Sequence, residues 1–61
     1  MNLPNDPVML LSVINTQLRD HYSSFDELVT DNELSEADMT AIIEKLEMID
    51  YVYDSNSNQF K

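Results

Sequence analysis

The chain has 61 residues and a formal net charge of -9, with three lysine or arginine residues against twelve aspartate or glutamate residues. It has no cysteine, which excludes a disulfide framework and a thiolate zinc site, and no glycine, which excludes glycine-dependent phosphate loops. This length makes one domain, residues 1–61, that buries only about 60% of the surface its unfolded form exposes. Self-association to a homodimer is one open route to further stability.

The first predicted element is a long helix that begins at Pro7 and ends between residues 21 and 23. Asp6 is placed to accept backbone N–H groups as its N-cap, and proline is well tolerated at the first helical position. Apolar residues then recur at helical spacing: Val8, Leu11, Ile14, Leu18 and Tyr22, with Leu10 and Val13 widening the stripe. The apolar run at residues 8–11 is too short for a membrane span or a signal sequence. We therefore expect a cytoplasmic protein without a membrane segment.

A second, short helix is predicted from Phe25 to about Thr30. Ser24 and Glu27 fit the capping-box pattern, in which the serine oxygen accepts one backbone N–H and the glutamate accepts another. A polar turn follows. Because the chain has no glycine, Asn32 is the expected left-handed residue of this turn.

The strongest helical pattern begins after Ser35. Ser35 and Asp38 predict a capping box, and acidic residues in the first turn suit the positive end of the helix dipole. The buried stripe of this third helix is expected to be Met39, Ile42, Ile43, Leu46 and Ile49. Asp50 follows at the position where helices commonly place a left-handed glycine.

Residues 51–53 and 59–60 alternate as two short strands around the turn-forming residues 54–58, which predicts a β-hairpin. The sequence leaves the register of this hairpin open, because one more residue in the loop would move every side chain to the other face of the sheet. Of the possible registers, we expect the one that pairs Tyr53 with Phe60 on the core side. The fold class is thus mainly α (α+β): a three-helix helix-turn-helix core with a C-terminal β-hairpin, in the order of a winged-helix domain. The predicted core is Leu11, Ile14, Leu18, Phe25, Leu28, Leu34, Met39, Ile42, Ile43, Leu46 and Ile49.

A helix-turn-helix commonly binds DNA, but the charge of this chain argues against it. In DNA-binding versions the second helix of the motif lies in the major groove, while lysines and arginines contact phosphates. Here the predicted exposed face carries Glu36, Glu44 and Glu47 with a single lysine, Lys45. Because phosphate contacts dominate affinity, we expect no direct DNA binding. A nucleic-acid-associated transcriptional regulator, acting within an assembly that supplies positive charge, is the alternative function.

No pattern in the chain predicts catalysis, a cofactor or a metal site. The chain has one histidine, His21, whereas triad chemistry needs a nucleophile, a base and an orienting group that converge on a cleft. Asp54, Asn56 and Asn58 match the first ligand positions of a calcium loop, but Gln59 stands where the sharp turn needs glycine. We interpret them as a turn and leave a weak cation site open.

Several short motifs run through the chain. They are Leu3-Pro4-Asn5-Asp6-Pro7, residues 10–16 and 18–20, Ser24-Phe25-Asp26-Glu27-Leu28, Tyr51-x-Tyr53-Asp54 and Asn58-x-Phe60. Together they resemble a family of uncharacterised bacterial proteins of about this length, a domain of unknown function with an N-terminal Leu-Pro-x-Asp-Pro motif. The resemblance implies a free-standing small bacterial protein and brings no activity, ligand or catalytic residue. It draws attention to Asn15, Arg19 and Asp20.

The function that these features favour is a non-catalytic protein–protein interaction module. Met9 and Met48 fall outside the two predicted helical stripes and are expected at the surface, and exposed methionine beside tyrosine suits a protein contact. The predicted partner-binding set is Asn15, Arg19, Met48, Tyr51 and Tyr53. Arg19 has a rival interpretation, in which it fixes the junction of the first two helices by an ion pair with Asp20, Asp26 or Glu27.

Overall fold

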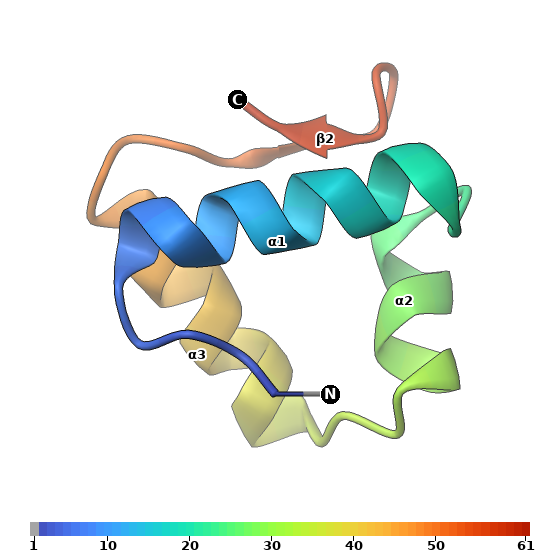
Figure 1. Cartoon of the computed structure of the whole chain (residues 1–61), viewed down its shortest axis with the longest axis horizontal. Helices are drawn as coiled ribbons and strands as arrows, with labels where there is room; N and C mark the ends of the chain where they lie inside the picture. Colours follow the sequence, from blue (N-terminus) through green and yellow to red (C-terminus); the bar gives the residue numbers. More distant parts are fainter. Residues whose placement is uncertain (1) are drawn as a thin grey trace.

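The computed structural model describes residues 2–61 as three α-helices followed by a two-stranded antiparallel hairpin (Figure 1). The elements are α1 (Pro7–Asp20), α2 (Phe25–Asp31), α3 (Glu36–Glu47), β1 (Tyr53–Asp54) and β2 (Gln59–Phe60). This confirms the predicted α+β class and the order of three helices before a hairpin. Within residues 2–61, none of the helices has the length and apolar composition needed to cross a membrane.

The predicted caps of α1 and α3 are confirmed. An Asp6 carboxylate oxygen accepts the N–H of Met9 at 3.1 Å, and proline occupies the first turn of α1. At α3, Ser35 Oγ accepts the N–H of Asp38, while the Asp38 carboxylate accepts the N–H of Ser35, each at 3.1 Å. These caps satisfy backbone donors that a helix leaves unpaired at its N-terminus.

The cap of α2 differs from the prediction in one of its two bonds. Ser24 Oγ accepts the N–H of Glu27 at 3.1 Å, as expected. The Glu27 carboxylate, however, accepts from Ser23 and not from Ser24. Ser23 offers two donors, its N–H and its hydroxyl, and these hydrogen bonds hold the pKa of Glu27 below its ordinary value, the hydroxyl having the larger effect.

Left-handed backbone occurs at Glu33, Asp50 and Asn58, with φ of 54°, 66° and 53°. The prediction for Asp50 is confirmed, and the prediction for Asn32 is wrong. Asn32 has φ of -91° as the C-cap of α2, because its side-chain amide donates to the carbonyl of Leu28 at 2.8 Å and keeps it next to the helix end. The following residue, Glu33, adopts the left-handed conformation of the turn instead.

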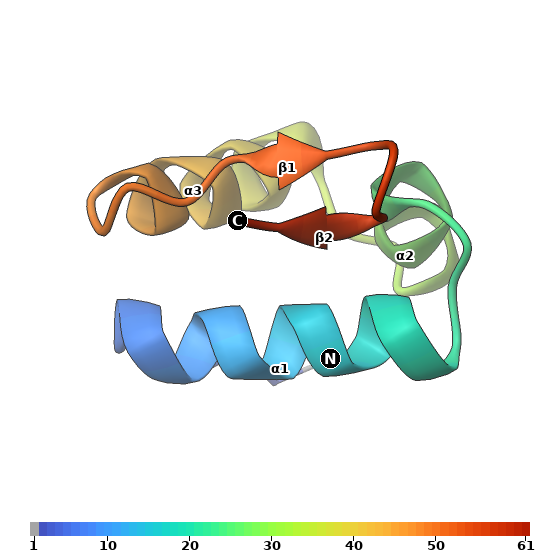
Figure 2. The same ribbon diagram turned by 90° about the horizontal axis from the view of Figure 1, so that it is seen from above.

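Helix α1 is central, since it contacts α2, α3 and β2. Figure 2 shows the hairpin running beside α1, with β2 between β1 and the helix. Tyr53 pairs with Phe60, which confirms the predicted register. Both rings contact the ring of Phe25 in α2: Tyr53 is tilted against it with centroids 5.8 Å apart, and Phe60 meets it edge to face with centroids 5.1 Å apart. The predicted strand at residues 51–53 begins later than expected, because the N–H of Tyr51 still donates to Leu46 of α3 at 2.9 Å.

The buried core differs from the predicted one at its edges. It consists of Leu10, Ile14, Leu18, Phe25, Leu28, Ile42, Leu46 and Phe60. Leu10 replaces the predicted Leu11, because Leu10, Ile14 and Leu18 repeat at i, i+4 and i+8 and this stripe faces both α3 and β2. Phe60 is a further addition, because the hairpin packs along α1. The other differences are half-buried residues that pack against this cluster: Leu34, Met39, Ile43 and Ile49.

Candidate functional site

Two of the five predicted partner-binding residues hold the hairpin in place. The side-chain amide of Asn15 on α1 donates to the carbonyl of Phe60 at 3.0 Å and accepts the N–H of Phe60 at 2.8 Å. Both polar functions of this half-buried amide are therefore engaged with β2. Tyr53 is also half-buried, and its ring lies against Phe60 with centroids 5.4 Å apart.

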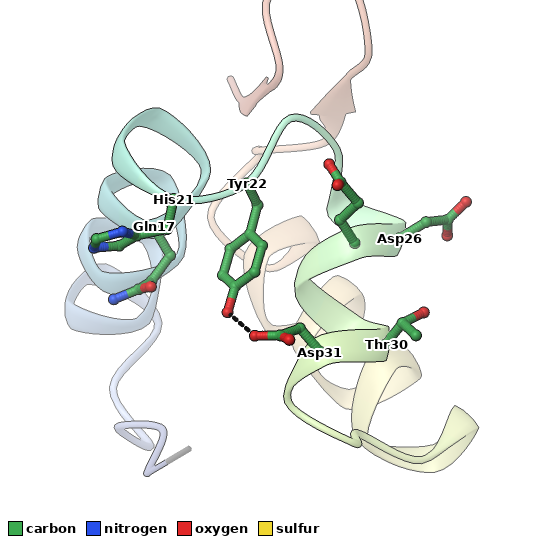
Figure 3. Close-up of a pocket in the computed structure, with 7 residues that line it drawn as sticks. Gln17, His21, Tyr22, Asp26, Thr30 and Asp31 are labelled. Atoms are coloured by element: carbon green, nitrogen blue, oxygen red, sulfur yellow. Dashed lines mark hydrogen bonds between the residues drawn. The ribbon is translucent and has the colours of Figure 1, made fainter.

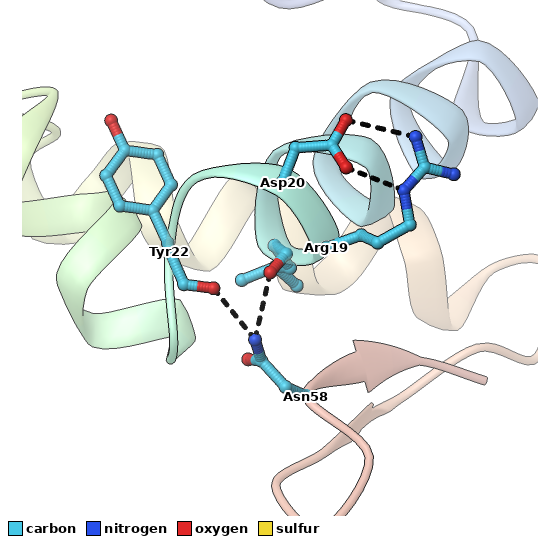
Figure 4. A network of polar contacts seen from close by, with 5 residues as sticks. Arg19, Asp20, Tyr22 and Asn58 are labelled. Atoms are coloured by element: carbon cyan, nitrogen blue, oxygen red, sulfur yellow. Dashed lines mark hydrogen bonds and ion pairs between the residues drawn. The ribbon is translucent and has the colours of Figure 1, made fainter.

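The hydroxyl of Tyr53 belongs to a polar network that joins the hairpin to both neighbouring helices. It donates to Oδ1 of Asn58 at 2.7 Å and accepts the N–H of Phe25 at 3.2 Å. Nδ2 of Asn58 donates to the carbonyls of Leu18 and Tyr22 at 3.1 Å and 2.9 Å (Figure 4). The hairpin turn thus satisfies the carbonyl of Leu18 in the last turn of α1, which a helix leaves without an internal partner, and the carbonyl of Tyr22 in the loop that follows.

Arg19 is exposed and pairs within its own helix. Its Nε and second guanidinium nitrogen donate to the two carboxylate oxygens of Asp20 at 2.8 Å and 3.0 Å (Figure 4). The hydrogen bond from Arg19 lowers the pKa of Asp20. The predicted ion pair between Arg19 and Asp20 is confirmed, but both residues belong to α1, so the pair does not fix the junction of α1 with α2. The hydroxyl of Tyr22, which follows α1, makes this link by donating to Asp31 of α2 at 2.6 Å.

A cleft of about 830 Å³ opens between the end of α1 and α2 (Figure 3). Hydrogen bonding to the Asp31 carboxylate raises the pKa of Tyr22, because it favours the protonated phenol. Glu27, whose carboxylate accepts from Ser23, lines the cleft at the N-terminal end of α2. The cleft wall combines one imidazole, one phenol and three carboxylates with two neutral side chains: Gln17, His21, Tyr22, Asp26, Glu27, Thr30 and Asp31.

The loop with calcium-like spacing has its carboxylate occupied by donors of the protein itself. Oxygens of Asp54 accept from the N–H of Asn56 at 3.2 Å, from Ser57 Oγ at 2.8 Å and from Lys61 Nζ at 3.1 Å. The Ser57 hydroxyl has the largest effect in lowering the pKa of Asp54, followed by Lys61. This pattern is typical of a turn in which aspartate accepts from residues that follow it.

The large apolar side chains that are exposed within residues 2–61 come from two segments. These segments are the first turn of α1 and the connection from α3 to β1, and both lie at the left end of the molecule in Figures 1 and 2. Met48 is 77% exposed and Val52 is 55% exposed. We call the whole set the apolar end: Val8, Met9, Met48, Tyr51 and Val52.

Comparison with known protein families identifies the family. Residues 4–60 match the model of DUF4250, a domain of unknown function. The chain belongs to the DUF4250 family. Comparison with curated proteins and with solved structures gave no match. The match covers every helix and strand of this DUF4250 domain, together with the apolar end.

The sequence pattern identified Met9, Met48 and Tyr51 of the apolar end and missed Val8 and Val52. It assigned Val8 to the buried stripe of α1, whereas Val8 is exposed. The signal was present, because Val8 stands two residues before the buried Leu10 and a step of two rotates a side chain by about 200° around a helix. Val52 was missed because its exposure depends on the path of the chain between α3 and β1.

Proposed function

We propose that this DUF4250 domain is a non-catalytic protein-interaction module that binds its partner through the apolar end. The observation that supports this function is that the large exposed apolar residues within residues 2–61 come from two segments, and both segments lie at the same end of the molecule (Figures 1 and 2). Burying apolar surface is favourable by about 25 cal/mol per Å². Apolar patches on the surface of a small protein mark interaction sites more often than isolated apolar residues do.

The backbone beneath the apolar end is held in place, which favours binding. The N–H of Tyr51 donates to Leu46 at 2.9 Å, and Val52 and Lys61 exchange two backbone hydrogen bonds at 3.2 Å and 2.9 Å. Asp50, with φ of 66°, reverses the chain immediately before Tyr51. A surface that is already ordered loses less conformational entropy when a partner binds.

Site-specific photo-crosslinking tests this function. A benzophenone amino acid replaces Val52 in one variant and Thr40, an exposed residue of α3, in the control. We expect a discrete protein adduct from position 52 and none from position 40. The adduct should disappear when Met48→Lys is added and persist when Glu36→Lys, which places a lysine away from the apolar end, is added instead.

Two results would contradict the proposal. One is equal crosslinking from positions 52 and 40, which would show that contact with the apolar end is not specific. The other is an adduct that forms only while nucleic acid is intact and vanishes after nuclease treatment. That second result would favour a regulator that acts within a nucleic-acid assembly.

A further inference from the structure

The hydrogen-bond pattern of the hairpin fixes the direction of the backbone groups at Tyr53. Val52 and Lys61 donate to each other's carbonyls at 3.2 Å and 2.9 Å, so they form a hydrogen-bonded pair. In an antiparallel ladder the next pair is not hydrogen-bonded, and its N–H and C=O groups point away from the partner strand. That next pair is Tyr53 and Phe60. Each strand therefore presents one N–H and one C=O at its outer edge.

The outer edge of β2 is closed by a side chain. The amide of Asn15 accepts the N–H of Phe60 at 2.8 Å and donates to its carbonyl at 3.0 Å, as a neighbouring strand would. In Figure 2, β2 is the strand that runs next to α1. The two hydrogen bonds between Phe60 and Asn15 also confirm that the N–H and C=O groups of the Tyr53–Phe60 pair point away from the partner strand.

The outer edge of β1 has no such cover. Neither the N–H nor the carbonyl of Tyr53 has a hydrogen-bond partner among residues 2–61. Unpaired backbone groups at a strand edge are a template for another strand. Tyr51 and Val52, which belong to the apolar end, lead directly into this edge. An added strand would therefore meet backbone donors and acceptors and an apolar surface together.

We propose that an extended segment of a partner protein, with apolar side chains flanked by lysine or arginine, adds to the edge of β1 at Tyr53. Backbone hydrogen bonds to Tyr53 align the segment, and its apolar side chains cover Tyr51 and Val52, which is the general pattern of β-strand addition. The inference rests on the proposed interaction function and specifies its partner.

Charge complementarity selects a basic segment. Glu47 and Asp50 are exposed on either side of Met48, and the chain as a whole carries a net charge of -9. The three cationic side chains already have partners within the fold, since Arg19 contacts Asp20, Lys45 contacts Asn5 and Lys61 contacts Asp54. A binding segment therefore has to bring its own positive charge, which also accelerates its association.

A second copy of the chain fits this edge less well. Antiparallel pairing of two β1 strands about Tyr53 would place Val52 opposite Asp54 of the other copy. It would also bring together two chains that each carry a net charge of -9, and like charges oppose association. Because the edge is short, we expect a contact in the class of weak, transient interfaces.

Chemical synthesis of the chain permits a direct test at one backbone atom. The probe is a fluorescent seven-residue peptide of alternating lysine and valine, and binding is followed by fluorescence anisotropy. The test variant carries an N-methyl group on the Tyr53 amide, which removes the outward donor and blocks the edge. The matched control carries the same group at Asn2, because residues 2–5 lie on the far side of the molecule from the hairpin in Figure 1.

We expect the peptide to bind the parent and the Asn2 control equally and to bind the Tyr53 variant about tenfold more weakly, as expected for the loss of one hydrogen bond. An alternating lysine–glycine peptide should bind more weakly than the lysine–valine peptide. In the unmodified parent, the saturating peptide should slow hydrogen exchange of the Tyr53 amide. This last measurement tests the edge even if N-methylation disturbs folding.

The inference is wrong if peptide binding leaves exchange at Tyr53 unchanged, or if the lysine–glycine peptide binds as tightly, since the attraction would then be charge alone. It is also wrong if sedimentation shows a dimer that N-methylation at Tyr53 abolishes, because the occupant would then be a second copy. Position-specific crosslinking at Val52 without protection of Tyr53 would leave the proposed function standing and remove only strand addition. Failure of the crosslinking test would remove the proposed function itself.

Discussion

Replacing Asn15 with leucine should destabilise the domain strongly, although the two side chains have similar sizes. The Asn15 amide makes two hydrogen bonds to Phe60, at 2.8 Å and 3.0 Å, in a half-buried position. Leucine leaves both backbone groups of Phe60 without their partner and keeps water away from them. An unsatisfied buried polar group costs about 1–3 kcal/mol.

We expect Asn15→Leu to lower the free energy of unfolding by about 2–4 kcal/mol, since two groups are affected and the site is only half-buried. A chain of 61 residues has a total stability of roughly 3–9 kcal/mol, so the variant loses a large share of it. Asn15→Ala should lose less, about 1–3 kcal/mol, because the smaller side chain admits water to Phe60.

Asn15→Asp provides a chemical check on the same two bonds. The carboxylate still accepts the N–H of Phe60 but repels its carbonyl, which has lost its donor. Once the carboxyl group is protonated, below about pH 4, it donates again. This variant should therefore approach the stability of the parent as the solution is acidified, whereas Asn15→Leu should not.

Urea denaturation followed by circular dichroism measures these changes. Gln17→Leu is the matched control, because Gln17 is another half-buried amide of α1 and its side chain has no hydrogen bond within the described residues. The control should change the unfolding free energy by no more than about 0.5 kcal/mol. The reasoning is refuted if Asn15→Leu unfolds at the urea concentration of the parent, or if the control is equally damaging.

Leu46→Ala should lower the unfolding free energy by about 2–5 kcal/mol in the same assay, because Leu46 is 0% exposed and alanine leaves a cavity; a melt like that of the parent would contradict its place in the core. Asn58→Gly and Asn58→Ala both remove the bonds to the end of α1, but thermal melting should find the alanine variant less stable by about 1–2 kcal/mol, because only glycine accepts φ of 53° without strain. Hydrogen bonds to Asp54, above all from Ser57, lower the pKa of its carboxyl group in the folded protein. The parent should therefore be more stable than Asp54→Asn by a constant amount above about pH 4, and this difference in unfolding free energy should shrink as the pH falls through the pKa of folded Asp54. Ser57→Ala should reduce that pH dependence, and a constant difference between pH 6 and pH 2 would contradict the assignment. The parent should give no saturable mobility shift with random duplex DNA at about 10 mM ionic strength, where electrostatic attraction is strongest, and a shift at micromolar protein would refute the expectation drawn from its charge.

Contacts between residues close in the sequence determined what could be predicted without the structure. Asp6 reaches Met9, and Ser35 and Asp38 reach each other, within one helical turn. Such bonds form wherever the local backbone turns into a helix, so the residue types are enough to predict them. The left-handed conformation at Asp50 belongs to the same class.

These local predictions failed where two adjacent residues could make the same hydrogen bond or the same turn. Ser23 displaced Ser24 as the donor to Glu27 because two of its groups face the carboxylate. Asn32 uses its side chain to hold the end of α2, and so Glu33 makes the reversal. Residue preferences rank such alternatives but do not decide between adjacent residues.

The candidate sites depend on tertiary packing. The amide of Asn15 meets Phe60 across 45 residues of sequence, and the amide of Asn58 meets Leu18 across 40. The chain alone presents Asn15 as one more polar residue of an amphipathic helix, because nothing local distinguishes a solvated amide from one that pairs with a strand. The helices and the caps of α1 and α3 were determined by the sequence. The hairpin register, the closed edge of β2, the open edge of β1 and the exposure of Val52 were decided only when the hairpin packed along α1, since hydrogen bonds and burial between distant segments exist only in the folded chain.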